Sequence, residues 1–181
     1  MNKLDKIAIY AIGFIFFLLI LFYSVNINFK YLNMKNDARP EIISLKENLK
    51  QLDCLTRNIY WEAANEPVEG KIAVAQVTMN RVNDGRFGET ICSVVYQKTK
   101  VSQRVVCQFS WVCENKHKVQ PIAESHYKES EDIAKKVLFE NFRLPSLTEA
   151  IFYHADYVNP RWNKKRIVKI GRHIFYKEKT R

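Results

Sequence analysis

Glycine and histidine are scarce in this chain, and several common catalytic signatures are missing from it. Five glycines and four histidines occur among 181 residues, and none of the glycines forms a phosphate-binding loop. The patterns HExxH and GxSxG are also absent from the sequence. These absences leave the zinc metalloproteases, the α/β-hydrolases and the P-loop nucleotide-binding proteins without support.

Charge is missing from one long stretch near the N-terminus. The 23 residues of the range 7–29 contain no acidic or basic side chain. As a helix they would extend about 34 Å, which is enough to cross the hydrocarbon layer of a membrane. The end of the stretch, residues 23–27, is Tyr-Ser-Val-Asn-Ile and makes a poor signal-peptide cleavage site. We therefore expect an uncleaved N-terminal membrane anchor over residues 1–29, although basic residues on both of its sides leave its orientation open.

After the anchor we expect a polar stem with an amphipathic helix over residues 30–52 and one domain over residues 53–181. Within the domain, apolar residues recur at helical spacing, and Asp53 is placed to cap the start of the first helix. Residues 98–117 show no clear period and are expected to be a loop with short extended pieces. Alternation near the C-terminus predicts a small antiparallel sheet. The expected fold class is α+β, mostly helical, with one transmembrane helix before it.

All four cysteines follow the anchor, which suits disulfides in an oxidising compartment. Four cysteines permit three pairings. The short separation of Cys107 and Cys113 favours that pair and leaves Cys54 to pair with Cys92. Reduced core cysteines are the alternative, and a zinc site has the least support because no close histidine pair completes a ligand set. We expect no metal and no cofactor.

The chain is strongly basic, with 29 Lys and Arg residues against 19 Asp and Glu residues and a net charge of +10. Such a surface favours nucleic acid, anionic lipid or an anionic cell-wall polymer as a partner. The basic residues are scattered, and Lys164-Lys165-Arg166 is their one tight cluster. A solvated basic surface is therefore the simplest explanation for any single lysine.

Among the carboxylates, Glu62 has the most unusual surroundings. It follows Tyr60 and Trp61 and precedes two alanines, close to an expected helix end. Apolar neighbours raise the pKa of a carboxyl group and keep its proton available at neutral pH, as a general acid requires. Glu66 and Glu69, which flank Pro67, are better explained as acids that favour a helix start. A buried structural ion pair is the competing explanation for Glu62.

Four blocks of sequence resemble the SleB-type cell wall hydrolases, the family of spore-cortex-lytic enzymes and related lysins. They are CLTRNIYWEAANEPVEGKIAVAQVTMNRV, TICSVVYQ, VCQFSWVC and AIFYHADYVNPRW…IGRHIFYK, and they cover about two-thirds of the chain. The resemblance implies a lysozyme-like fold that cleaves peptidoglycan glycan strands, with Glu62 as the catalytic acid. It also implies that five residues lie near the glycan cleft: Gln108, Phe109, Ser110, Tyr153 and His154. Many members read Glu-Ala-Arg-Gly-Glu where this chain has Glu-Ala-Ala-Asn-Glu, so the contacts made by the missing arginine and glycine are not carried over.

The family resemblance favours a lytic transglycosylase with one glutamate, acting between N-acetylmuramic acid and N-acetylglucosamine. A muramidase-type hydrolase would need a second carboxylate, for which Glu66 and Asp156 are the candidates. A non-catalytic wall-binding module and a charge-driven binder of nucleic acid or lipid are the alternatives from other classes. We expect peptidoglycan and the membrane as partners, no nucleic acid, and a catalytic domain on the periplasmic or outer side of the cytoplasmic membrane. The sequence leaves the oligomeric state and the bacterial or phage origin open.

Overall fold

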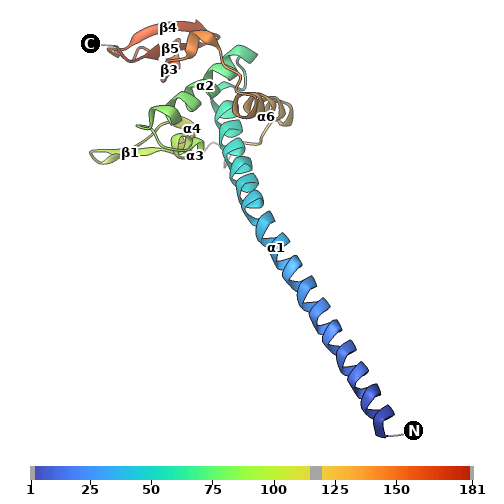
Figure 1. Cartoon of the computed structure of the whole chain (residues 1–181). Coiled ribbons are helices and arrows are strands. Elements are labelled where there is room, and N and C mark those ends of the chain that lie inside the picture. The colour runs from blue at the N-terminus through green and yellow to red at the C-terminus, as the bar shows by residue number, and fades with distance from the viewer. Residues whose placement is uncertain (1–2, 115–119, 180–181) are drawn as a thin grey trace. The chain divides into compact units, whose positions relative to one another are not determined.

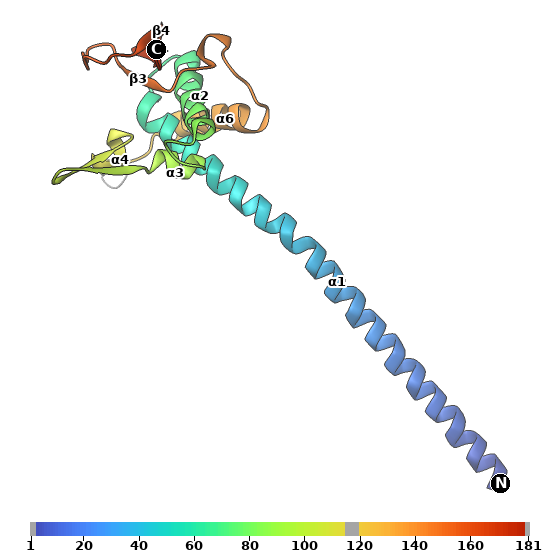
Figure 2. The ribbon, with the colours of Figure 1, turned by 60° about the vertical axis from the view of Figure 1, so that its left-hand side comes forward.

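The computed structural model describes residues 3–114 and 120–179, without the side chains of residues 3–11 and 33–40. The chain forms two compact units, one up to Glu47 and the other from Asn48 onward. Figures 1 and 2 show the ribbon from two directions. The second unit contains every residue that the sequence analysis assigns to a site.

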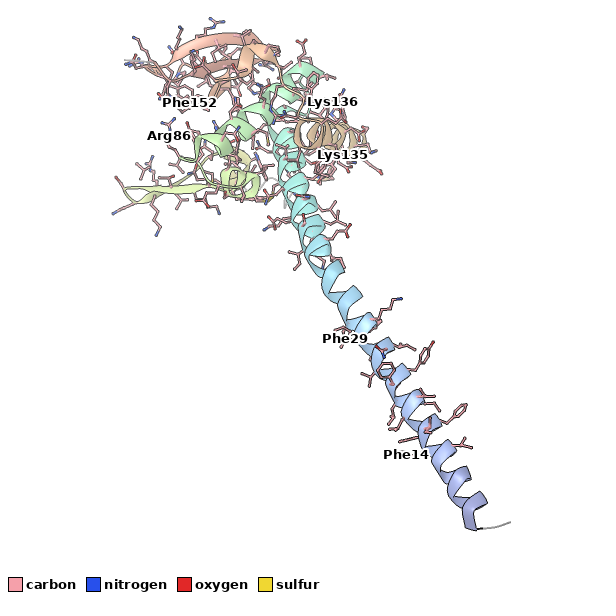
Figure 3. The ribbon with its side chains drawn as sticks, in the orientation of Figure 1. Phe14, Phe29, Arg86, Lys135, Lys136 and Phe152 are labelled. Carbon is pink, nitrogen blue, oxygen red and sulfur yellow. A yellow bond between two sulfur atoms is a disulfide. The ribbon has the colours of Figure 1, made fainter. Side chains whose placement is uncertain are left out.

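Helix α1 runs without interruption over Lys3–Ala63. Among the described residues, one helical stretch, Ile12–Leu32, is long and apolar enough to cross a membrane, with a mean hydropathy of 2.1. Its side chains are exposed, and Figure 3 shows Phe14 and Phe29 pointing away from the helix. The residues expected to form a polar stem belong to the same helix.

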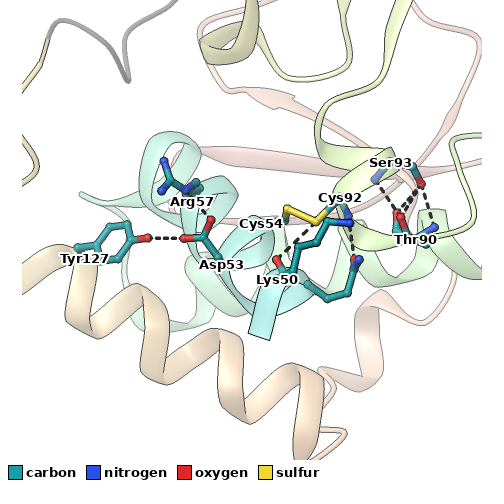
Figure 4. The surroundings of a disulfide bond; sticks show 9 residues. Lys50, Asp53, Cys54, Arg57, Thr90, Cys92, Ser93 and Tyr127 are labelled. Carbon is teal, nitrogen blue, oxygen red and sulfur yellow. Dashed lines mark hydrogen bonds and ion pairs between the residues drawn. A yellow bond between two sulfur atoms is a disulfide. The ribbon is translucent and has the colours of Figure 1, made fainter. Parts of the chain in front are cut away.

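The predicted helix start at Asp53 is wrong, because α1 continues through this position. The Asp53 carboxylate accepts hydrogen bonds from Arg57 Nε at 2.8 Å and from the Tyr127 hydroxyl at 3.1 Å (Figure 4). Asp53 is thus one member of an ion pair between residues four apart on the helix surface, rather than a cap. An aspartate that precedes apolar residues at helical spacing can be a helix N-cap or a member of an ion pair on the helix surface. The sequence alone did not distinguish these two roles.

The core of the domain is helical. The last turns of α1 pack with α2 (Val68–Asp84), α3 (Ile91–Val95) and α6 (Glu124–Phe139), and a short helix, α4, spans Ser110–Glu114. Helix α2 ends at Gly85, whose positive φ of 76° lets its N–H bond the carbonyls of the last turn. Thr90 and Ser93 form a reciprocal cap at the start of α3. Completely buried side chains in this core include Leu55, Ile59, Val94 and Val137.

A three-stranded antiparallel sheet follows the 3₁₀ turn Pro145–Leu147. It consists of β3 (Phe152–Ala155), β4 (Lys165–Ile170) and β5 (His173–Lys177) in the order β3-β5-β4. Phe175 on the central strand is completely buried against α2 residues such as Ala73 and Val77. The C-terminal sheet and the mostly helical α+β class are therefore confirmed.

A separate hairpin occupies part of the segment that was expected to be a loop. Strands β1 (Lys98–Val101) and β2 (Arg104–Cys107) pair along their full length as an antiparallel ribbon. Every residue from 98 to 106 is exposed. The two strands confirm the short extended pieces that were expected here, but their pairing into a hairpin was not predicted. Neither face of the ribbon packs on the core, so its sequence carries no alternation of apolar and polar residues.

Two disulfides join the pairs that the sequence favoured. Cys54 of α1 bonds to Cys92 of α3 (Figure 4). The side chain of Gln51, also in α1, accepts a hydrogen bond from the Cys92 N–H at 3.0 Å. Cys107 at the end of β2 bonds to Cys113 of α4. The first bridge closes a sequence separation of 38 residues and the second a separation of 6 residues.

Removing the longer bridge should cost more stability than removing the shorter one. Loop-closure entropy predicts losses of about 4 kcal/mol for Cys54→Ser with Cys92→Ser, and about 2 kcal/mol for Cys107→Ser with Cys113→Ser. Urea unfolding of the full chain in detergent measures both variants against the parent. A larger loss for the short loop would contradict an entropic origin of the stabilisation.

Candidate active site

Glu62 lies one residue before the end of α1 and is half-buried. It borders two neighbouring cavities of about 460 and 420 Å³. We call the larger one the aromatic cavity and the smaller one the polar cavity. The residues that line both are Trp61, Glu62, Ala155, Tyr157 and His173. The two cavities therefore meet at Glu62 and together form a cleft that passes this carboxylate.

All six residues assigned from the sequence line the aromatic cavity, namely Glu62, Gln108, Phe109, Ser110, Tyr153 and His154. They come from the end of α1, from the turn between β2 and α4 with the first residue of α4, and from β3. The fold thus brings together side chains that lie up to 92 positions apart in the chain. Their roles toward a substrate stay predictions.

Tyr153 is hydrogen-bonded to Glu62. Its hydroxyl donates to Glu62 Oε2 at 3.0 Å. Burial, together with the nearby charge of Glu62, raises the pKa of Tyr153 well above its usual value, so the hydroxyl keeps the proton that it donates. Tyr153 also pairs with Phe175 across β3 and β5, which fixes the position of its ring. One oxygen of the Glu62 carboxylate is therefore held in a defined direction.

Arg81 of α2 places a buried positive charge behind this pair. Its Nε donates to the Ile151 carbonyl at 2.8 Å, and its guanidinium lies 5.2 Å from the Phe109 ring centre and 5.8 Å from that of Tyr153. Burial lowers the pKa of Arg81, and the negative charge of Glu62 opposes this change. An arginine retains its proton even so. Arg81 was not predicted from the sequence, because a single arginine at a helical position usually faces solvent.

The amide of Gln108 connects Arg81 to the base of the hairpin. The Gln108 amide can be oriented so that both its oxygen and its nitrogen form hydrogen bonds. In this orientation the oxygen accepts hydrogen bonds from Arg81 Nη1 at 3.0 Å and from Arg81 Nη2 at 3.2 Å. Its nitrogen then donates to Gln97 Oε1 at 3.1 Å. Gln108 thus has a structural function in addition to lining the cavity.

His173 of β5 lies where the two cavities meet and was also missed. It is buried, and its Nδ1 makes no hydrogen bond with any described residue. Burial lowers the pKa of His173, and the charges of Glu66 and Asp156 partly oppose the change. The imidazole is therefore held in its neutral form at the cleft. Its place in the block IGRHIFYK was the signal that could have found it.

Both ring nitrogens of His154 form hydrogen bonds with neighbouring groups. Its Nδ1 is 2.8 Å from the Ala155 carbonyl, so this nitrogen donates, and its Nε2 then accepts from the Tyr176 hydroxyl at 2.9 Å. The ring also meets Trp162 edge-on at 5.5 Å. His154 is therefore positioned to support the cavity wall.

Aromatic side chains form much of the cleft wall. Trp162 is 43% exposed and packs edge-on against Phe152, and both line the aromatic cavity. On the other side Trp61 stacks on the buried Trp111, with ring centres 6.2 Å apart. Aromatic surfaces combined with polar side chains such as Glu62 and Tyr153 are typical of sites for small organic molecules.

The other candidate carboxylates have structural partners. Glu66 Oε2 accepts from the Arg172 backbone N–H at 2.8 Å, in the turn that joins β4 to β5. Asp156 lines neither cavity and pairs with Lys169 at 2.8 Å, and the hydrogen bond from Lys169 lowers the pKa of Asp156. Among the residues that the structure describes, no group of three or more His, Cys, Asp or Glu side chains could hold a metal ion.

The mostly helical domain with its small antiparallel sheets has the fold of a SleB catalytic domain. Two solved structures match it at 26% sequence identity. The catalytic domain of the germination-specific lytic transglycosylase SleB from Bacillus anthracis has a TM-score of 0.50, covering 70% of this chain and 93% of that chain. The catalytic domain of the Bacillus cereus SleB protein has a TM-score of 0.51, covering 72% and 91%.

Residues 65–176, more than half of the chain, match the model of the Cell Wall Hydrolase family, and the chain belongs to this family. The match begins three residues after Glu62. The spore cortex-lytic enzymes of Oceanobacillus iheyensis and Bacillus subtilis are each 26% identical, over 130 and 125 residues, or 70% and 67% of this chain. The matched regions span 41% and 35% of those relatives' own lengths.

Proposed function

We propose that this protein cleaves the glycan strands of peptidoglycan as a lytic transglycosylase, with Glu62 as its single acid and base. The observation that carries the proposal is the position of Glu62 in the cleft. It is the one carboxylate among the described residues that line the aromatic cavity. The aromatic walls offer flat surfaces for sugar rings on either side of it.

In the first step Glu62 donates its proton to the glycosidic oxygen between N-acetylmuramic acid and N-acetylglucosamine. The bond from C1 of the muramic acid to that oxygen breaks, and positive charge develops at C1. In the second step the 6-hydroxyl of the same muramic acid attacks C1, and the Glu62 carboxylate takes the hydroxyl proton. Glu62 ends the reaction protonated, and the product is a 1,6-anhydro sugar without added water.

The neighbours of Glu62 support this cycle. The Tyr153 hydroxyl holds one carboxylate oxygen in place, so the carboxyl group keeps its direction in both steps. The Arg81 charge lies close enough to stabilise the carboxylate formed after the first step. Neutral His173 lines the same cleft without adding a positive charge beside C1.

A muramidase-type hydrolase is the second candidate, because Glu66 lines the polar cavity together with Glu62. As the second carboxylate it would have to activate a water or attack C1. Its Oε2 already accepts a hydrogen bond from the β4–β5 turn, which favours a structural role for this carboxylate.

Mass spectrometry of digested peptidoglycan separates the two candidates. The transglycosylase will release muropeptides that end in 1,6-anhydro-muramic acid. Reducing ends that carry one added water would show a hydrolase instead. Tight wall binding with no released fragment would show a non-catalytic wall-binding module, and both outcomes overturn the proposal.

We further infer that the apolar helix anchors the protein in the cytoplasmic membrane with its domain on the outer side. The support is the apolar Ile12–Leu32 stretch together with two disulfides, which persist outside the cytoplasm. External protease added to spheroplasts should digest the domain. Complete protection of the domain would reverse the orientation.

A further inference from the structure

The hairpin of residues 98–107, which we call the basic hairpin, carries charge of one sign. Lys98, Lys100 and Arg104 are exposed on it, and no acidic residue occurs in the sequence between Glu89 and Glu114. Within the described ranges 3–114 and 120–179, none of these three bases makes an ion pair. The hairpin therefore presents uncompensated positive charge to its surroundings.

The same hairpin also exposes apolar side chains on both of its faces. The register pairs Lys100 with Val105 on one face, and pairs Thr99 with Val106 and Val101 with Arg104 on the other. The three valines are between 52% and 56% exposed. An isolated two-stranded ribbon is marginally stable by itself, and it buries nothing here that would explain its valines. Mixed apolar and basic faces of this kind suit a partner that offers both methyl groups and carboxylates.

The base of the hairpin is fixed at the rim of the Glu62 cleft. The disulfide from Cys107 to Cys113 closes its last strand onto α4, and the Gln108 N–H donates to the Gln97 carbonyl at 2.9 Å. Gln108 and the two residues after it line the aromatic cavity. Figure 1 shows the hairpin extending away from the helices, with the C-terminal sheet on the other side of α2. A polymer that occupies the cleft thus leaves it beside the hairpin.

We propose that the basic hairpin binds the acidic peptide stems that branch from the glycan strand in the cleft. This inference rests on the proposed function, because it takes peptidoglycan as the occupant of the cleft. The stems begin at the lactyl group of muramic acid, next to the bond that would be cleaved, and they carry free carboxylates and alanine methyl groups. The three bases pair with the carboxylates, and the valines contact the methyl groups. The hairpin then selects peptide-bearing strands over bare glycan.

Charge reversal tests this inference through binding to two substrates. The variant Lys98→Glu, Lys100→Glu, Arg104→Glu is made in full-length Glu62→Gln protein, so that no cleavage disturbs the measurement. Its sedimentation with intact sacculi is compared with its sedimentation with sacculi whose stems an amidase has removed. We expect about a tenfold loss of affinity for intact sacculi, since each exposed ion pair contributes modestly, and little change for stripped strands.

A matched control carries the same change of charge elsewhere. Lys165→Glu, Arg166→Glu and Lys179→Glu alter three exposed bases that line neither the aromatic nor the polar cavity. The control should keep the parent's affinity for intact sacculi. Thermal unfolding of both triple variants establishes that each is folded.

Three results would overturn the inference. An equal loss on stripped strands would mean that the hairpin contacts sugar, and an equal loss in the control would mean that only net charge matters. Unchanged wall binding with lost binding to vesicles of anionic lipid would assign the hairpin to the membrane. Failure of the proposed function is visible separately, because the parent protein would then release no anhydro-muropeptide whatever the hairpin binds.

Discussion

A Glu62→Gln variant should lose nearly all glycan cleavage, by about 10²- to 10⁴-fold, the usual contribution of a positioned general acid and base. The amide keeps the size of the side chain and still accepts a hydrogen bond from Tyr153 Oη, so the cleft stays intact. It cannot release a proton to the leaving oxygen or take one from the 6-hydroxyl. Release of soluble muropeptides from purified peptidoglycan measures the loss.

Glu69→Gln is the matched control for this experiment. Glu69 is an exposed acid in the first turn of α2, and it lines neither cavity. Its replacement should cost at most about 1 kcal/mol of helix-start stability and leave turnover unchanged. If the Glu62→Gln variant lysed peptidoglycan at the parent's rate, both the assignment of Glu62 as the acid and the single-acid mechanism would be contradicted.

The second large effect is expected at Gly171, in the turn between β4 and β5. This residue has a φ of +55°, and a Cβ placed on it would lie 1.9 Å from Glu66 Oε2. Gly171→Ala would therefore add left-handed backbone strain and displace the carboxylate that accepts from the Arg172 N–H. We expect a loss of about 2 to 4 kcal/mol, the sum of the strain and of one broken charged hydrogen bond. Urea unfolding of the full chain in detergent measures it.

Gly85 is a control for the backbone strain, because a substitution there adds the same kind of strain without a steric clash. Its φ is +76°, and a Cβ there would meet nothing within 4 Å. Gly85→Ala should therefore cost only about 1 to 2 kcal/mol. Combining Gly171→Ala with Glu66→Ala should cost less than the sum of the two single changes, because the clash disappears. Equal losses for the two glycine variants would show that Glu66 does not hold this turn.

The sequence was sufficient for features that depend on local pattern. The small antiparallel sheet near the C-terminus was predicted, because the residues of β5 alternate between core and surface and a turn glycine, Gly171, comes before them. Glu62 was selected from its apolar neighbours and from the family block, and the structure places it in the lining of both cavities, while its catalytic role stays a prediction. The five residues that share its cavity needed the family blocks, because spacing along the chain carries no information on contacts between strand β3 and the turn before α4.

Features that depend on tertiary contacts were missed. Arg81 is buried only because three aromatic rings from other segments surround its guanidinium. His173 is neutral only because the fold buries it beside the cleft. Similarly, the basic hairpin pairs with itself and packs on nothing, so its strands show neither of the two hydrophobic periods by which a sequence reveals its structure.

The stacked pair Trp61 and Trp111 has a consequence for spectroscopy. The chain contains three tryptophans, and the third, Trp162, lines the aromatic cavity together with Trp61. No tryptophan occurs in the unit up to Glu47. All tryptophan emission of the full-length protein therefore originates from two residues that line the cleft, Trp61 and Trp162, and from Trp111 beside Trp61. A sugar ring that binds in the cleft would change the polarity around Trp61 and Trp162. The tryptophan fluorescence of the unlabelled protein would therefore measure how much of the cleft is occupied.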